Sequence, residues 1–311
     1  GDFLDFLAVP YVEYFDDCFW RDDSCLQKLK LIMDAHKEVF DALKKFINLK
    51  NKKVTYILGN HDAELYLQLV REYFLDFFDN SDNIEIKTME EDEYRPVSGV
   101  VIKHGHEYEI ANSTKQHDLI VRDEQNREFL IPPWGSYYIT RVINRFKSER
   151  RYVNAVRPIK RFIINGIIYD TFFTLRFVMA SLYYYLMVRF IYYFKQNKSK
   201  FNLFKFLKSE LYLFKTSEEI GKESIIDNED DNILIVGHTH YPEIDYLPDN
   251  KVFINTGTWT NMFNLDFGKE RENTLLTYAK IDVLNSQEQD PYDVNLLVWR
   301  GLDQKPYSEF S

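Results

Sequence analysis

The short stretch Gly237-His238-Thr239-His240 contains the residues of the chain that are best suited to chemistry. It follows residues 232–236, an apolar run of the kind that forms a buried strand. Two histidines two positions apart, just past the end of a strand, can direct both imidazoles to one side of a sheet edge. Neutral imidazole is the commonest protein ligand for transition metals. The pattern therefore predicts a metal site, and the alternative is a polar turn that happens to contain two histidines.

Three other stretches combine a glycine with Asp, Asn or His, and two of them also follow an apolar run. In chain order they are Gly1-Asp2-Phe3-Leu4-Asp5, Gly59-Asn60-His61-Asp62 after residues 54–58, and His104-Gly105-His106 after residues 100–103. With the histidine pair they form the ordered series GDxxD, GNHD, HGH and GHTH. This series resembles the motifs of the calcineurin-like metallophosphoesterases, whose ligands lie on loops at the carboxyl ends of sheet strands. The resemblance covers residues 1–110 and 230–262.

The resemblance implies a centre that holds two divalent metal ions. In that centre Asp2 bridges both ions, the second ion is bound by Asn60, His104 and His238, and the first ion is bound by His240. Two such ions generate hydroxide at neutral pH and neutralise the charge that develops during attack on a phosphate. Mn²⁺ is the expected metal, and Fe, Zn or Co also suit a set of Asn, His and Asp ligands.

The same resemblance gives His61 and Asp5 catalytic roles without metal contact. It implies that His61 faces the substrate and stabilises or protonates the leaving oxygen, while Asp5 pairs with His61 and orients it. A neighbouring carboxylate raises the pKa of an imidazole and favours the protonated form that can donate a proton. Asp62 is interpreted as a helix cap or a neighbour of the ligands, and His106 as a neighbour of the ligands or a substrate contact.

The family's Asp-x-His motif, which precedes GDxxD and supplies two ligands of the first ion, has no counterpart at that place. The one Asp-x-His of the sequence, Asp34-Ala35-His36, falls downstream inside a predicted helix. We expect the sequence to be a fragment that lacks about one βα unit of roughly 30 residues, and the alternative is a degenerate member that has lost one metal site. In either case the chain should bind one metal ion more tightly than two.

The composition indicates a packed globular protein with one large domain or two. Of 311 residues, 45% are hydrophobic and 28% are charged, which favours a packed core over general disorder. The two cysteines, Cys18 and Cys25, form no disulfide framework and fit a reducing compartment. We therefore expect a cytoplasmic protein, with a peripheral position at the inner face of the membrane if its basic segment binds lipid.

Charge is divided unevenly along the chain. Residues 141–215 carry 16 Lys and Arg against three acids, a net charge of +13, while the remainder carries −23. A basic segment inside an acidic protein indicates an anionic partner. Its aromatic and aliphatic residues could enter the acyl boundary of a bilayer while its bases meet anionic headgroups, an interpretation that we weigh equally with plain packing. Nucleic acid ranks third. Spanning is disfavoured because the longest uncharged run, residues 177–188, has 12 residues where about 20 are needed.

The periodicity of the sequence predicts an α/β fold, and the resemblance implies a two-sheet metallophosphoesterase sandwich flanked by helices. We expect a core of residues 1–110 and 226–311, with a large helical insertion at 111–225 that acts as a lid or a membrane-facing cap. Helices are predicted at 26–49, with His36 on the apolar stripe, and at 63–78, capped by Asp62. Strands are predicted at 54–58, 84–86, 100–103, 232–236, 251–255, 274–281 and 294–300, and Pro242 should prevent a regular element around it.

The expected function is hydrolysis of a phosphoester or pyrophosphate bond by a bridging hydroxide that attacks phosphorus. The segment INTGTW at residues 254–259 is similar to one in the phosphoesterases that include the UDP-2,3-diacylglucosamine hydrolases, which favours a lipid-linked or nucleotide-sugar substrate. The alternatives are a nuclease or a protein phosphatase of the same fold, although the arginine that protein phosphatases place after GDxxD is Phe6 here. A non-catalytic binding scaffold on this fold is a further alternative.

Overall fold

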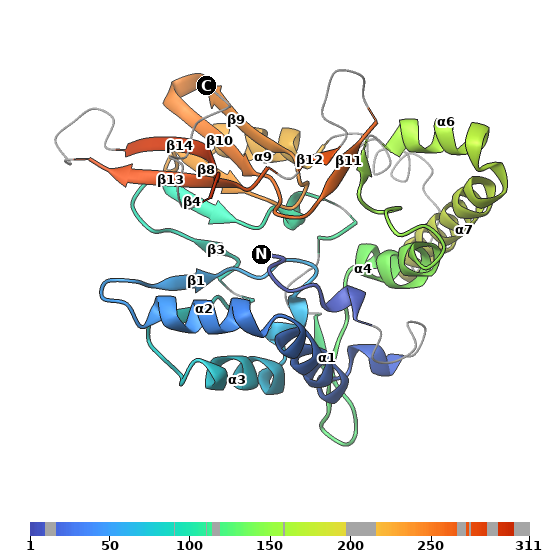
Figure 1. The fold of residues 1–311 in the computed structure, drawn as a ribbon, viewed down its shortest axis with the longest axis horizontal. Coiled ribbons are helices and arrows are strands. Elements are labelled where there is room, and N and C mark those ends of the chain that lie inside the picture. The colour runs from blue at the N-terminus through green and yellow to red at the C-terminus, as the bar shows by residue number, and fades with distance from the viewer. Residues whose placement is uncertain are drawn as a thin grey trace.

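The computed structural model describes residues 1–9, 17–89, 91–109, 111–113, 119–157, 159–196, 216–265, 272–273, 275–284 and 292–301. Within these residues the chain forms a mixed α/β structure in which two halves lie one above the other, with a helical lobe at one side (Figure 1). The first residue of the chain lies between the two halves.

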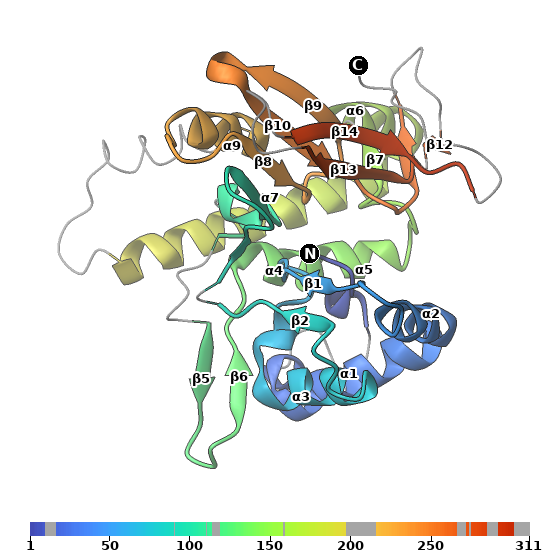
Figure 2. The ribbon, with the colours of Figure 1, turned by 90° about the vertical axis from the view of Figure 1, so that its left-hand side faces the viewer.

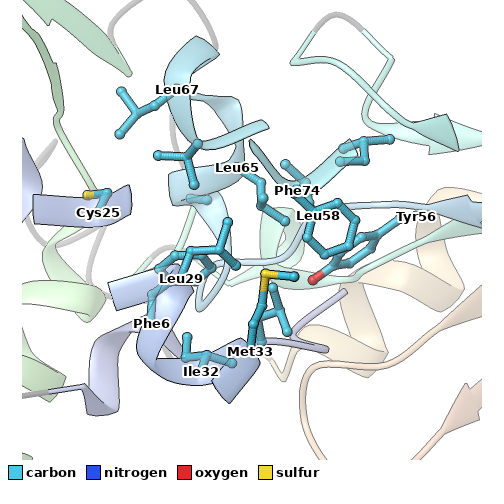
Figure 3. Packing of buried hydrophobic residues seen from close by; sticks show 14 of the residues in the cluster. Phe6, Cys25, Leu29, Ile32, Met33, Tyr56, Leu58, Leu65, Leu67 and Phe74 are labelled. Atoms are coloured by element: carbon cyan, nitrogen blue, oxygen red, sulfur yellow. The ribbon is translucent and has the colours of Figure 1, made fainter. Parts of the chain in front are cut away.

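The lower half contains two short parallel strands and three helices. Strand β1 (Val54–Tyr56) pairs in parallel with β2 (Ile84–Ile86). The helices are α1 (Asp22–Ala35), α2 (Lys37–Ile47) and α3 (Gln68–Phe77). Their apolar faces share one large core with the N-terminal loop, so that the loop with the GDxxD motif is anchored by hydrophobic packing (Figure 3).

Each of the two predicted helices in this half is divided. The predicted helix at 26–49 is two helices, because His36 leaves helical geometry at their junction with φ −120° and ψ 31°. His36 is exposed, so its expected place on the apolar stripe is wrong. The predicted helix at 63–78 begins as the 3₁₀ turn Ala63–Tyr66 and becomes α3 only after the extended residue Leu67.

The upper half is built on a five-stranded sheet whose centre is parallel. In spatial order its strands are β3 (Glu93–Tyr94), β4 (Val100–Lys103), β8 (Ile233–Val236), β10 (Lys251–Thr256) and β9 (Pro242–Leu247). The three central strands run parallel, and the two edge strands run antiparallel to their neighbours. The expectation for Pro242 is wrong: this residue starts the edge strand β9, where a missing N–H breaks no interior ladder.

Different elements cover the two faces of this sheet. Helix α9 (Ser217–Ile226) packs on one face, where Ile225 meets the ring of Phe253 in a shared core. The antiparallel hairpin of β13 (Thr277–Val283) and β14 (Tyr292–Val298) packs on the other face. With both faces covered, the middle of each central strand is apolar, and the polar residues Lys103, Lys251, Asn255 and Thr256 stand at the strand ends.

The α/β class is confirmed, but the sandwich of two continuous sheets is not. The described strands pair into five sheets, four of which have only two or three strands. The strands predicted at 274–281 and 294–300 form a hairpin of their own, and in the described part of the chain β1 pairs with β2 alone. Strands of three residues bury little surface, so the helices supply most of the lower core instead.

Most of the described residues between 111 and 225 are helical, but this part of the chain also contains a hairpin that was not predicted. Strands β5 (Ile120–Arg122) and β6 (Glu128–Leu130) pair in antiparallel fashion and extend away from the body (Figure 2). The turn between them contains Asn126 in a left-handed conformation, with φ 61°. Three-residue strands around a polar turn carry too short an alternation to stand out in the sequence.

The helical lobe has a small core of its own. Its elements are α4 (Trp134–Tyr138), a π-helical turn (Ile139–Ile143), α5 (Asn144–Lys147), α6 (Ile159–Tyr169) and α7 (Thr171–Gln196). A short strand, β7 (Val156–Arg157), pairs with β11 (Met262–Asn264), which also pairs with β12 (Glu272–Asn273). Residues 197–215, the remainder of the basic segment, lie outside the described residues.

A fully buried ion pair crosses the lower core. Lys28 of α1 donates to Glu64 at 2.8 Å, and both side chains are 0% exposed. The Lys28 ammonium also lies 3.8 Å from the centre of the Phe19 ring. A buried charge is tolerated only when an opposite charge is paired with it. This ion pair therefore holds α1 against the segment that follows the GNHD motif.

We expect Glu64→Gln to lower the free energy of unfolding by about 3–5 kcal/mol, because it leaves a buried ammonium without its counter-charge. The double variant Lys28→Met with Glu64→Leu should recover most of that loss, since it removes both charges. Urea unfolding would measure both effects. Lys37→Met, which breaks the exposed pair with Asp41, is the control and should change stability by less than about 1 kcal/mol. Equal losses in the single and double core variants would contradict this account.

The two thiols should differ sharply in reactivity. Burial raises the pKa of the Cys25 thiol to about 12, so the reactive thiolate is absent below that pH in the folded chain. Cys18 is only partly buried. Iodoacetamide at pH 8 should label Cys18 first and Cys25 only after denaturation, and raising the pH to about 10 should not change that order. Rapid labelling of Cys25 in the native chain, followed by mass spectrometry of the peptides, would show the burial to be wrong.

Candidate metal centre

The histidine motifs lie side by side at one edge of the five-stranded sheet. Strands β4 and β8 are parallel neighbours in which Ile102 pairs with Ile235, so both strands end at the same edge. His104 follows β4 there, and its carbonyl accepts a hydrogen bond from the backbone N–H of Gly237 at 2.9 Å. The loop with His238 therefore lies against the loop with His104.

The N-terminal loop brings the carboxylates to this edge from the other half of the molecule. The backbone N–H of His61 donates to Oδ1 of Asp2 at 2.9 Å, which joins the GDxxD loop to the GNHD loop. Oδ2 of Asp2 lies 3.1 Å from Nε2 of His104. The candidate centre is thus formed between the two halves, from loops that are distant in the sequence.

Backbone geometry at the centre is unusual in three of the predicted ligands. Asp2, His238 and His240 have φ of 55°, 69° and 66°, the left-handed region that non-glycine residues rarely adopt. Such conformations cost about 1–3 kcal/mol each and persist where the surroundings hold them. The cost is concentrated on the residues that would bind the metal.

Three of the predicted ligands form a compact group. One ligand atom from each of Asp2, His104 and His238 lies within 4.8 Å of the others, which is the only such group found among the described residues and includes no ion. The rings of His104 and His238 have centres 5.2 Å apart. His240 is not a member of this group, so the described geometry supports one cation position better than two.

Two buried atoms at this position are of the kind that a metal ligand would offer. Oδ1 of Asn60 has no hydrogen-bond partner among the described residues, and Nε2 of His104 faces Oδ2 of Asp2 at 3.1 Å. Buried polar atoms are normally paired, so an unpaired acceptor beside a carboxylate fits a cation site. Glycine at position 59 lets the predicted ligands lie close to the backbone. A Cβ there would be 2.1 Å from Oδ1 of Asp2 and 2.7 Å from Nε2 of His104, which is too close for any other residue.

The ionisation states suit cation binding. Burial opposes the charge of Asp2, but the neighbouring His104 and His61 outweigh burial and hold the pKa of Asp2 well below its usual range. Burial lowers the pKa of His104 to about 4, even with Asp2 beside it. At neutral pH the group therefore offers an ionised carboxylate and a neutral imidazole with a free lone pair.

His61 and Asp5 form the predicted pair beside the centre. Nδ1 of His61 lies 2.9 Å from Oδ1 of Asp5. Burial disfavours the imidazolium of His61, but the charge of Asp2 and the hydrogen bond to Asp5 outweigh burial and raise the pKa of His61 to about 9. At neutral pH this imidazole carries two protons, as a general acid requires.

Two residues next to the ligands were missed in the sequence. Oε2 of Glu109 lies 2.5 Å from Nε2 of His238, and it also accepts from Nδ2 of Asn112 at 2.7 Å. Oδ1 of Asn112 in turn accepts from Nδ2 of Asn60 at 3.4 Å. Glu109 thereby fixes the ring of His238, as carboxylates do for metal-binding histidines, and leaves Nδ1 as the nitrogen that can face a cation. The one indication in the sequence is that both residues come shortly after the HGH motif.

Asn255 was also missed as an organiser of the histidine loop, although it lies in the INTGTW segment. Its buried amide donates to the carbonyl of Gly237 at 3.1 Å and to Oγ1 of Thr239 at 2.8 Å. Its Oδ1 accepts from the backbone N–H of Gly257 at 3.0 Å. These bonds hold the strained turn between the two histidines.

The two residues with open interpretations take different positions. Asp62 makes no cap bond to the turn that follows it; its carboxylate is buried and accepts from the backbone N–H of Gly59 at 2.5 Å instead, so the helix-cap interpretation is wrong. His106 lies beside His104, with ring centres 5.3 Å apart, and its Nδ1 has no hydrogen-bond partner. Burial lowers the pKa of His106 to about 3, which keeps it neutral.

Comparison of the chain with protein-family models, with curated proteins and with solved structures finds no match. The geometry of the loops and the chemistry of their side chains are therefore the basis for a functional interpretation.

We expect the metal-free chain to bind one Mn²⁺ tightly, with Glu109→Ala weakening that site about 10–100-fold because the His238 ring loses its orienting carboxylate. Asp2→Ala should abolish tight binding. Isothermal titration calorimetry would give both the stoichiometry and the affinity. Glu72→Ala, which removes an exposed acid of α3, is the matched control and should leave binding unchanged. Two equally tight sites, or an unaffected Glu109 variant, would show that the ligands are assigned wrongly.

Proposed function

We propose that this chain is a metal-dependent hydrolase of phosphoester or diphosphate bonds. The observation that carries the proposal is the convergence of Asp2, His104 and His238 on one point, beside an unpaired amide oxygen of Asn60. Carboxylate, imidazole and amide oxygen together form a donor set that suits Mn, Fe, Zn or Co, with Mn²⁺ the expected metal. The ordered series of motifs supports the same class.

The four side chains would share the work of holding the cation. Asp2 contributes the negative charge, His104 and His238 contribute neutral nitrogens, and Asn60 contributes its amide oxygen. A divalent ion bound there would supply positive charge for the phosphate oxygens and an activated water at neutral pH. A second ion, with His240 among its ligands, is proposed on the family resemblance.

His61 is the residue placed to assist departure of the leaving oxygen. It extends from the loop that also carries Asn60, and its side chain is 24% exposed, so one ring nitrogen can reach a substrate. Nδ1 is held by Asp5, which leaves Nε2 as the atom that donates a proton to the leaving group. A binding scaffold would have no need for such a pair, and for this reason we favour an enzyme.

The substrate is proposed more narrowly as a lipid-linked or nucleotide-sugar phosphoester, on the similarity of the INTGTW segment. A protein phosphatase is less favoured. Protein phosphatases have an arginine at the position of Phe6, and Phe6 is fully buried in the lower core and cannot reach a substrate. A cytoplasmic location remains part of this proposal.

The test is hydrolysis of bis(4-nitrophenyl) phosphate by the chain with Mn²⁺ added. His61→Ala should lower kcat by about 10²–10⁴-fold through loss of proton donation, while Mn²⁺ affinity measured by calorimetry stays within about twofold. His36→Ala, at the exposed junction of α1 and α2, is the control and should retain full activity.

The outcomes separate the possible errors. Loss of Mn²⁺ binding by His61→Ala would contradict its role as a proton donor. No Mn²⁺-dependent hydrolysis of this diester or of a diphosphate ester by the unaltered chain would overturn the proposed class and favour the scaffold.

A further inference from the structure

The helical lobe presents a continuous apolar face to solvent. On α6 and α7 the side chains of Tyr169, Phe172 and Tyr183 are 85%, 75% and 70% exposed, and Ile168 and Met179 are 65% and 62% exposed. Large apolar side chains exposed singly are ordinary, but a contiguous set on one face marks an interaction surface. We call these five residues, together with Leu175, the outer face of the lobe.

The outer face follows the helical repeat. On α7 the positions 172, 175, 179 and 183 recur every three or four residues, so they form one stripe along this helix, while Ile168 and Tyr169 lie at the end of the preceding helix α6. The opposite stripe of α7, with Phe173, Phe177 and Tyr184, is buried in the core of the lobe. Helix α7 is therefore apolar on both sides, and packing within the chain accounts for only one of them.

The charges around this face are almost all positive. Residues 141–196 carry eleven Lys and Arg and two acids. Both acids are already paired within the lobe, Glu149 with Arg176 at 2.8 Å and Asp170 with Arg150 at 2.6 Å. Exposed bases such as Arg145, Arg151 and Lys160 are left to meet an outside partner.

We propose that the outer face of the lobe docks on the surface of an anionic lipid bilayer. Apolar and aromatic side chains would enter the boundary between headgroups and acyl chains, while the surrounding bases meet phosphate groups. The charge pattern favours lipid over a second copy of this chain. In a symmetric dimer formed through this face, the positive lobe of one copy would face the positive lobe of the other, and the two would repel.

The structure favours a position in the plane of the surface over a span. Residues Thr171–Val188 are apolar and long enough to cross a bilayer, and 22% of this window is buried inside the protein. The inner stripe of α7 is held by the lobe, however, and Arg176, the sixth residue of the window, pairs with Glu149. A span would have to break these contacts and bring a charge into the bilayer.

The experiment is flotation of the whole chain with vesicles made of equal parts phosphatidylglycerol and phosphatidylcholine. We expect the chain to float with these vesicles, to bind less to phosphatidylcholine alone, and to be released by about 1 M NaCl, where the screening length falls to about 3 Å. The triple variant Phe172→Ser, Met179→Ser and Tyr183→Ser should bind at least about tenfold more weakly, since it removes the inserted side chains.

The control replaces three exposed apolar side chains that lie outside the lobe, namely Val39→Ser, Leu49→Ser and Tyr246→Ser, and should float like the unaltered chain. Thermal unfolding of both triple variants checks that each is folded. Equal flotation of the two variants would overturn the proposal. If light scattering shows a dimer that dissociates only in the outer-face variant, the face is a protein interface and the proposal is overturned. If the bound chain resists extraction with alkaline carbonate, α7 spans the bilayer, and this result also overturns the proposal.

Discussion

One buried carboxylate, that of Asp62, holds the loops of the candidate centre in place. It accepts hydrogen bonds from the backbone N–H of Phe3 at 3.0 Å and of Gly59 at 2.5 Å, and from the hydroxyl of Tyr56. Phe3 is adjacent to Asp2, and Gly59 is adjacent to Asn60. A carboxylate without solvent must be satisfied by donors of the protein, so these three hydrogen bonds favour the arrangement in which the two loops lie together.

The sequence predicted that its motifs meet at one edge of a sheet, and the described structure brings Asp2, His104 and His238 together there. Parallel neighbouring strands then bring His104 and His238 together without further information. The sequence was a poor guide to their supporting residues. Glu109 reaches His238 across 129 positions of the chain, and before folding it looks like any surface acid. The hydrogen-bond role of Asp62 likewise depends on donors that only the fold supplies.

The errors in secondary structure have local causes. The 3.6-residue pattern continues through His36, so a single residue outside helical geometry leaves no trace in the periodicity. Proline predicts the end of a regular element, but Pro242 begins β9, because the sequence does not distinguish an edge strand, where proline is tolerated, from an interior one. The predicted second sheet is not found among the described residues, because β13 and β14 pair only with each other and β1 pairs with β2, while helices fill the lower core.

The base of the helical lobe contacts the loops of the candidate metal centre. Oγ of Ser136 in α4 donates to the carbonyl of Asn60 at 3.4 Å, and Nδ2 of Asn144 in α5 donates to the carbonyl of Leu7 at 2.8 Å. Gly135 lies so close to Asn112 that a Cβ there would be 2.2 Å from its Oδ1. The base of the lobe thus forms part of the wall around the ligands.

The two halves of the molecule have separate hydrophobic cores, and the predicted ligands are divided between them. Asp2 and Asn60 belong to loops of the lower half, whereas His104 and His238 end strands of the upper half. A cation shared by all four would act as a cross-link between two bodies, much as a disulfide joins two segments. Its binding energy would then add to the cohesion of the whole chain, so that loss of the ion would loosen the joint before either half unfolds.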